Sequence, residues 1–144
     1  MANVRQISVF MDNKPNQLSG VMQIIKDSGI NVRALSLADT KDFGILRIIV
    51  NDTDKTVESL KNAGYAVAVT EILAISIPDS PGQLSRVLEI LGSDNVNLEY
   101  LYAFTGASDK AVSFVIRVDD NEAAAASLTK GGIIQLTEND IAEM

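Results

Sequence analysis

The sequence contains no cysteine, no histidine and no tryptophan among its 144 residues. Without cysteine the chain has no disulfide framework, no thiolate nucleophile and no thiolate metal ligand. Without histidine it lacks both the usual general base and the commonest metal ligand, and a serine nucleophile would have no such base to activate it. We therefore expect a protein that is not an enzyme and that requires neither a metal nor another cofactor.

Positive charge is also scarce, since 12 lysines and arginines stand against 19 acidic residues, giving a net charge of −7. The basic residues are scattered, and an acidic chain repels phosphate backbones, so nucleic acid is not an expected partner. The opening "MANVRQISVFMDN" lacks the pattern of a secretion signal, and no apolar run approaches the roughly 20 residues that span a bilayer. We expect a cytoplasmic protein with no membrane partner.

The chain does contain an internal repeat. Its composition, 47% apolar and 22% charged, is that of an ordinary globular protein. "MDNKPNQLSGVMQII" near the start returns as "IPDSPGQLSRVLEIL" near the middle, and a shift of 66 positions aligns Pro15 with Pro81 and Leu18 with Leu84. With two residues added after Phe104 the match resumes, aligning Val50 with Val118. This pattern predicts two copies of one unit, residues 1–70 and 71–144.

Each unit shows the same succession of predicted elements. Apolar runs at 4–11 and 71–77 indicate strands, and apolar residues at helical spacing follow each of them. Two more strands joined by hairpin-like connections come next, then a second helix with Asp52 or Asp54, and Asp119 or Asp120, as candidate N-caps, and a fourth strand. The order β-α-β-β-α-β, found twice, predicts an α+β fold of two ferredoxin-like units in tandem, with antiparallel sheets covered by helices on one face. The helix patterns are Leu18, Val21, Met22 and Ile25, and Leu84, Val87, Leu88 and Leu91.

The two units are expected to share buried surface, because a unit of about seventy residues has a marginal core by itself. Only about Thr70 and Glu71 separate the predicted last strand of one unit from the first strand of the next. Apolar residues lie on both faces of the predicted strand near residue 100, with Leu98, Tyr100, Tyr102 and Phe104 on one face. We expect this open face to pack against the partner unit or another copy of the chain; the alternative is a slightly apolar exposed sheet.

The repeated prolines lie where a strand gives way to a helix, and proline fits the first helical position. In "DSPGQL" we expect Ser80 to be the N-cap and Gln83 to complete a capping box. Gly82 leaves the first-turn amides uncovered, and these amides can hold a carboxylate. A well-made helix start without a ligand is the alternative. Asn31 and Asn97 open the next strands, and an amide that donates and accepts suits a zwitterion.

These motifs carry a resemblance to a known family. "DSPGQLSRVLEIL" followed by "VNLEYLY" resembles the signature of ACT domains, a D-x-P-G-x-L pattern after the first strand and an Asn-led second strand. The resemblance covers both halves and implies small regulatory modules that bind amino acids, commonly at interfaces between paired units. It nominates as ligand-binding residues Asn13, Gln17, Leu18 and Asn31 in the first unit, and Asp79, Ser80, Gly82, Gln83, Leu84 and Asn97 in the second.

The first unit departs from this signature, since Asn16 replaces the glycine and Lys14 the capping residue. The departure implies a bulkier loop and a weaker or differently tuned site. The other half of each pocket is expected from the neighbouring unit.

The functional hypothesis is a stand-alone sensor that binds a free amino acid between its units, associates as a homodimer and modulates a metabolic enzyme. Two alternatives stay open, a small enzyme that uses carboxylates on the same fold and a non-binding assembly subunit of an enzyme.

Overall fold

The computed structural model describes residues 3–39, 43–106 and 110–144. The first unit comprises β1 (Val4–Asp12), α1 (Gln17–Asp27), β2 (Val32–Asp39), β3 (Phe43–Val50), α2 (Thr53–Asn62) and the first part of β4 (Ala66–Pro78). The second comprises the rest of β4, α3 (Gln83–Ser93), β5 (Leu98–Ala103), β6 (Ala111–Val118), α4 (Asn121–Lys130), β7 (Ile134–Leu136) and the short α5 (Glu138–Ala142). The predicted tandem ferredoxin-like fold is confirmed. The hairpin connections at 40–42 and 107–109 lie outside the described residues.

One strand, β4, serves both units. The sequence predicted two strands separated by Thr70 and Glu71, but these residues pair with Gln6 and Arg5 inside a continuous strand of 13 residues. The first part of β4 pairs with β1 and the last part with β6 and β7. The sheet therefore runs β2-β3-β1-β4-β6-β5 with β7 beside β4, and the boundary predicted at residue 70 falls within a strand rather than a linker.

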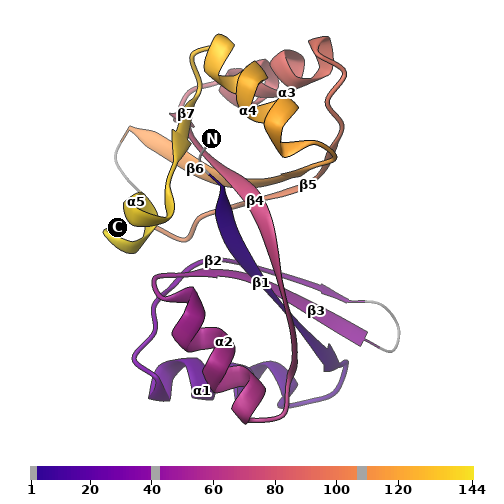
Figure 1. The fold of residues 1–144 in the computed structure, drawn as a ribbon, viewed down its shortest axis with the longest axis vertical. Helices are drawn as coiled ribbons and strands as arrows, with labels where there is room; N and C mark the ends of the chain where they lie inside the picture. Colours follow the sequence, from indigo (N-terminus) through magenta and orange to yellow (C-terminus); the bar gives the residue numbers. More distant parts are fainter. Residues whose placement is uncertain (1–2, 40–42, 107–109) are drawn as a thin grey trace.

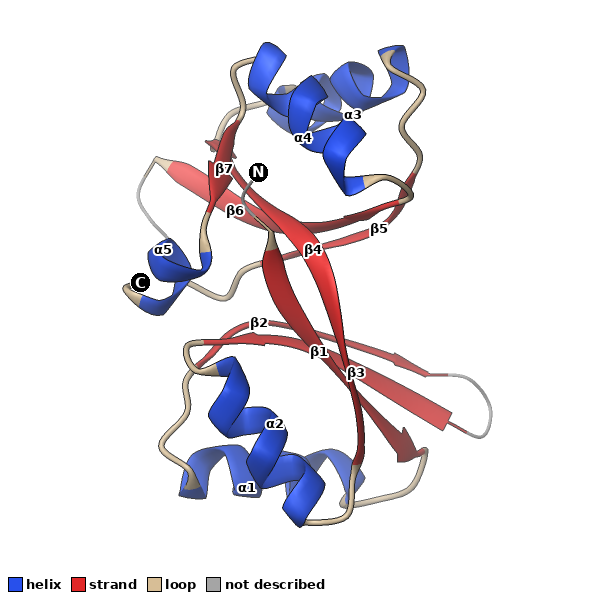
Figure 2. Cartoon of the chain, viewed as in Figure 1, coloured by secondary structure: helices blue, strands red, loops and turns tan. Residues whose placement is uncertain are grey.

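The helices lie at the two ends of the molecule and the strands lie between them (Figures 1 and 2). Helices α1 and α2 cover one face of the first half-sheet, formed by β4, β1, β3 and β2. Helices α3 and α4 cover the second half-sheet, formed by β7, β4, β6 and β5. Each pair of helices packs on its half-sheet around a separate apolar core. The core of the first unit includes Ile7, Val21, Leu46, Ile48 and Leu60, and the core of the second includes Leu73, Ile75, Val87, Ile116 and Leu128.

A third apolar cluster, here called the seam, joins the uncovered faces of the two half-sheets. Its buried members are Val4, Ala34, Ile49, Ile72, Ala74, Phe104, Val115 and Ile141. They come from β1, β2, β3, β4, β6, α5 and the residue after β5. The expectation that the open face packs against the partner unit is therefore confirmed for this part of the sheet.

The seam also holds a polar network. Gln6 is 1% exposed; its Nε2 donates to the Tyr100 hydroxyl at 2.8 Å, and the Tyr102 hydroxyl donates to its Oε1. The Arg47 guanidinium lies 4.2 Å from the centroid of the Tyr100 ring. Burial raises the pKa of Tyr102, and the neighbouring Tyr100 adds to the effect. These contacts couple β1 and β3 of the first unit to β5 of the second.

Leu98 does not share the tyrosine face, so that prediction is wrong. The register of β5 against β6 shifts between Leu98 and Tyr100. A bulge of this kind reverses the alternation of side chains. Leu98 therefore packs against the core under α3 and α4, whereas Phe104 contributes to the seam.

Among the described helices, none has the length and apolar character needed to cross a membrane.

Candidate functional site

The two repeated loops start α1 and α3 with the same backbone conformation. Asn16 (φ 72°) and Gly82 (φ 86°) are the N-caps, and neither helix has a side-chain cap. The predicted Ser80 cap and its capping box are therefore wrong, and Pro81 precedes the N-cap instead of opening the helix. Glycine and asparagine adopt the left-handed backbone conformation more readily than other residues. Because Gly82 has this conformation, the helix begins at Gln83.

This conformation leaves backbone donors at both helix starts. The amides of Gln17 and Gln83 donate at 3.4 Å to the carbonyls of Lys14 and Ser80. For the next two amides of each helix, those of Leu18 and Ser19 and of Leu84 and Ser85, the described residues supply no hydrogen-bond acceptor. Within the residues that the structure describes, two donors at the positive end of each helix dipole are therefore without an acceptor.

A cavity of about 210 Å³ lies beside the first loop. Three of the four residues nominated in the first unit line it, namely Asn13, Gln17 and Leu18. The Lys14 ammonium also lines it and lies 3.7 Å from the Asp12 carboxylate. Amide groups, one cation and one anion around a small cavity suit a zwitterion. In the second unit, Asp79, Ser80, Gly82, Gln83 and Leu84 follow one another along the equivalent loop and the first turn of α3.

Asn31 and Asn97 lie far from the helix-start loops of their own units. The Asn31 amide donates to the Asn51 side-chain oxygen at 3.0 Å, at the end of β3 opposite to Gly44. Val50 lies six positions along β3 from Gly44, or roughly 20 Å. The Asn97 amide donates likewise to Asp119 beyond the end of β6. Each helix carries the chain back along the sheet, so only another copy or unit could bring such an asparagine to a loop.

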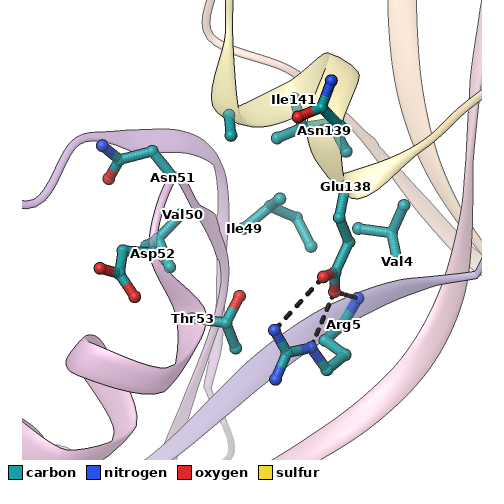
Figure 3. A pocket seen from close by; sticks show the side chains of 11 residues that line it. Val4, Arg5, Ile49, Val50, Asn51, Asp52, Thr53, Glu138, Asn139 and Ile141 are labelled. Atoms are coloured by element: carbon teal, nitrogen blue, oxygen red, sulfur yellow. Dashed lines mark hydrogen bonds and ion pairs between the residues drawn. The ribbon is translucent and has the colours of Figure 1, made fainter.

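A second cavity, of about 260 Å³, lies between α5 and the start of α2 (Figure 3). Sequence reasoning did not identify it. Apolar residues that include Val4, Ile49 and Ile141 line one part, and Asn51, Asp52, Thr53, Glu138 and Asn139 supply polar groups. Because these residues come from both units, this cavity lies at the seam.

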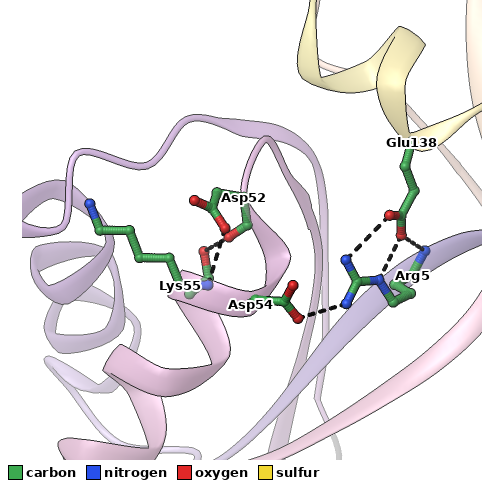
Figure 4. Close-up of polar contacts among 6 residues, drawn as sticks. Arg5, Asp52, Asp54, Lys55 and Glu138 are labelled. Carbon is green, nitrogen blue, oxygen red and sulfur yellow. Dashed lines mark hydrogen bonds and ion pairs between the residues drawn. The ribbon is translucent and has the colours of Figure 1, made fainter.

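Arg5 dominates the electrostatics of this seam cavity (Figure 4). Its Nε and its backbone amide donate to Glu138 Oε1 at 2.8 and 3.0 Å, and its Nη1 donates to Asp54 Oδ1 at 2.7 Å. These hydrogen bonds raise the pKa of Arg5, and the bond from Arg5 holds the pKa of Glu138 below 4.5. The guanidinium is thus occupied by the chain's own carboxylates, and it fastens α5 to the first unit.

The sequence gives only a weak signal for this cluster. Arg5 is a charged residue within the apolar run "VRQISVF", but its partner Glu138 lies 133 positions away. Pairing at such a separation follows from the tertiary structure and leaves no local pattern.

The equivalent cavity in the second unit differs in the charged side chains that line it. It measures about 430 Å³ and is lined by Asn3, Glu71, Asp119, Asp120 and Glu122, among others. The repeat places Glu71 where the first unit has Arg5, and Glu122 where it has Asp54. In the described part of the chain, no group of three acidic side chains is arranged to hold a metal ion.

Comparison with known proteins identifies the family and related folds. The family described as an ACT domain pair matches residues 2–144. A probable acetolactate synthase small subunit from Archaeoglobus fulgidus is 25% identical over 130 residues, covering 76% of this chain and 82% of the relative.

Two solved structures share the arrangement. Protein BT0572 from Bacteroides thetaiotaomicron superposes with a TM-score of 0.93 at 34% identity, over 99% of this chain and 97% of that one. The ligand-free regulatory subunit of aspartate kinase from Thermus thermophilus gives a TM-score of 0.67 at 17% identity, covering 91% and 93%, and this likeness concerns the fold. The chain therefore belongs to the family of ACT domain pairs.

Proposed function

We propose that this protein is a stand-alone regulatory protein that binds a free amino acid at its helix-start loops and modulates a metabolic enzyme. The observation that carries the proposal is the pair of backbone amides at Leu18 and Ser19, which have no acceptor among the described residues, on a loop whose small cavity is lined by Asn13, Gln17 and Lys14. The similarity to a probable acetolactate synthase small subunit supports a metabolic enzyme as the partner.

The proposed ligand is held by both of its charged groups. The helix-start amides and the Lys14 ammonium bind the α-carboxylate, and the Asn13 side chain with the Asp12 carboxylate receives the α-ammonium. In the second unit the amides of Leu84 and Ser85, the Ser80 hydroxyl and the Asp79 carboxylate take the same roles. Gln17 and Gln83 open the two helices and contact the ligand from the helix side.

We propose that Asn31 and Asn97 contact the ligand when two copies of the chain associate. Each is remote from the loop of its own unit, and we propose that another copy of the chain brings each asparagine to a bound ligand. The protein is therefore proposed to act as a homodimer, in the cytoplasm where free amino acids and biosynthetic enzymes are found.

Calorimetric titration of the protein with each of the twenty amino acids tests the proposal. We expect saturable binding of at least one amino acid and no comparable heat from the matching amine or carboxylic acid alone. Absence of binding by all twenty at millimolar concentration would contradict the sensor and would favour a non-binding assembly subunit.

A variant pair locates the site in the second unit. Asp79→Asn removes the carboxylate that is proposed to receive the ligand ammonium in this unit. We expect weaker binding at this loop with an unchanged circular dichroism spectrum. Glu89→Gln is the matched control, because Glu89 is an exposed carboxylate further along α3. Equal binding by both variants would remove the second-unit loop from the proposal.

A further inference from the structure

The face of the first half-sheet opposite its helices is only partly covered by the second unit. Cross-strand partners share a face, and Ala66, Phe10, Ile45 and Ala38 form one such row across β4, β1, β3 and β2. Phe43 lies one row further from the seam, opposite Asp12. These five residues are called the outer sheet face. Figure 1 shows this end of β2 and β3 extending past the second unit.

The outer sheet face is apolar and open. Phe10 is 44% exposed and Phe43 is 62% exposed, and Ala38 and Ala66 are exposed as well. Large apolar side chains gathered on one exposed face are characteristic of an interaction surface.

The fold itself does not require an aromatic residue at position 10. The repeat provides the comparison, because Ser76 pairs with Ser113 in the second unit as Phe10 pairs with Ile45 in the first. Both serines are half-buried in the same kind of strand. The same position therefore accepts a small polar side chain, and Phe10 is not needed to form the sheet.

A hollow of about 360 Å³ is lined by both phenylalanines together with Asp12, Gln17 and Tyr65. An aromatic ring from another surface can enter it. The outer sheet face thus offers both a projecting side chain, Phe43, and a recess beside it, and a surface with both can pair with itself around a two-fold axis.

Charge favours self-association at this face over other surfaces. The chain carries a net charge of −7, so two copies repel one another where acidic residues meet. The five residues of the outer sheet face are uncharged. The nearest charged side chains on this face are Asp12, which is paired with Lys14, and Arg47, which lies over the Tyr100 ring.

We propose that the outer sheet face binds the same face of a second copy of this chain, with Phe43 of each copy in the hollow of the other. Continuity with the seam supports this occupant, because the adjoining rows of the same face already pack against the open face of another ACT unit. The inference deepens the homodimer of the proposed function and does not depend on amino-acid binding. A sheet face is the contact surface, and the two copies stack on one another.

The test is sedimentation equilibrium of the full chain and of the double variant Phe10→Ser/Phe43→Ser. We expect a wild-type dimer and at least a roughly tenfold higher dimer dissociation constant for the double variant. Leu88→Ser is the matched control, since Leu88 is 42% exposed but lies on α3 at the far end of the molecule. Circular dichroism of both variants checks folding. The second unit already carries small residues at the equivalent positions, Ser76 for Phe10 and Ala111 for Phe43.

The possible outcomes distinguish the proposed interface from the homodimer itself. A wild-type dimer that weakens only in the phenylalanine variant supports the interface. A dimer that is equally stable in the double variant overturns the interface but leaves the homodimer. A wild-type chain that is monomeric at about 1 mM, far above the range of specific dimers, overturns both, and titration with amino acids then tests the sensor separately.

Discussion

At the scale of single residues, the left-handed N-caps and the Arg5 cluster determine the chemistry of this chain. Asn16 and Gly82 place two backbone donors at each helix start for which the described part of the chain offers no acceptor. Arg5 has the opposite arrangement, since its guanidinium and backbone amide are all engaged by Glu138 and Asp54. The first arrangement is open to a ligand and the second is closed.

Gln17→Glu separates ligand binding from stability. A carboxylate at the start of α1 interacts favourably with the helix dipole, so we expect the free energy of unfolding to rise by about 0.5 kcal/mol. The same charge lies beside the proposed carboxylate site, and we expect amino-acid affinity to fall at least about fivefold. Titration calorimetry and urea unfolding measure the two effects. Gln23→Glu, an exposed site further along α1, should leave affinity unchanged; equal loss in both variants would exclude a local effect.

Glu138→Gln tests the ion pair that fastens α5. Both partners are partly exposed, so we expect the free energy of unfolding to fall by only about 1 kcal/mol at pH 7. The pKa of Glu138 is lowered in the folded state, so its contribution is present above about pH 4.5 and is lost as the pH falls through the folded pKa. Urea unfolding at several pH values from 7 down to 2 measures this, and the difference from wild type should shrink steadily as the pH falls below about 4.5. Glu143→Gln is the control for loss of one charge. A difference that stays constant over the whole range would mean that the carboxylate charge is not the cause.

At the scale of elements, the two ends of the second unit differ from those of the first. The fourth strand of the first unit continues as the first strand of the second, whereas β7 ends after three residues and α5 follows it. A five-residue helix is not stable alone. The Thr137 capping box, the Arg5 pair and the burial of Ile141 in the seam hold α5 in place.

Ile141→Ala is expected to release α5. The side chain is 1% exposed, and truncation of a buried isoleucine costs about 2–4 kcal/mol. Hydrogen exchange should show faster exchange of the α5 amides, and urea unfolding should show the loss of stability. Ile134→Ala is the control, because Ile134 is largely exposed on β7 and its truncation should change stability by less than about 0.5 kcal/mol. Unchanged protection of α5 in Ile141→Ala would show that the seam does not hold it.

At the scale of the whole molecule, the two units form one body. They share β4, the seam cluster and the network of Gln6 with Tyr100 and Tyr102. A unit separated from its partner would expose the seam and leave half of β4 without a neighbouring strand. The outer sheet face extends the same arrangement to a second copy of the chain.

We therefore predict a single unfolding transition. Far-UV circular dichroism and tyrosine fluorescence should give the same urea midpoint, because Tyr65 belongs to the first core while Tyr100 and Tyr102 lie at the seam. Gln6→Leu leaves two tyrosine hydroxyls without their partner and should cost about 1–3 kcal/mol while keeping one transition. Tyr65→Phe is the control that leaves the seam unchanged. Two separated midpoints in the wild type would show that the units unfold independently.

Local features were predictable because interactions between residues close together in the sequence produce them. The helix-start loops recur at a fixed shift, and the apolar residues of α1 and α3 follow helical spacing. For α2 and α4 the sequence offered two candidate aspartate N-caps each. The structure shows that Asp52 and Asp120 accept the capping hydrogen bonds. The exception among local features was the start of α3, where Gly82 replaces Ser80 as the cap because a left-handed turn precedes the helix.

The candidate site was predictable only in part. Asn13, Gln17 and Leu18 lie together on one cavity because they are neighbours in sequence. Asn31 and Asn97 were grouped with the loops by motif, yet α1 and α3 carry the chain away before those residues occur, so they lie at the other end of each unit. The amino acid itself and the residues that another copy contributes stay predictions for calorimetry and sedimentation.

The sequence by itself determined the repeat, the order of strands and helices and the helix-facing cores, because each depends on the pattern of neighbouring residues. Only the tertiary structure decided that β4 runs unbroken through both units, that Arg5 contacts Glu138 and that part of one sheet face remains exposed. These features depend on contacts between residues far apart in the chain, and burial at such contacts is a property of the packed molecule.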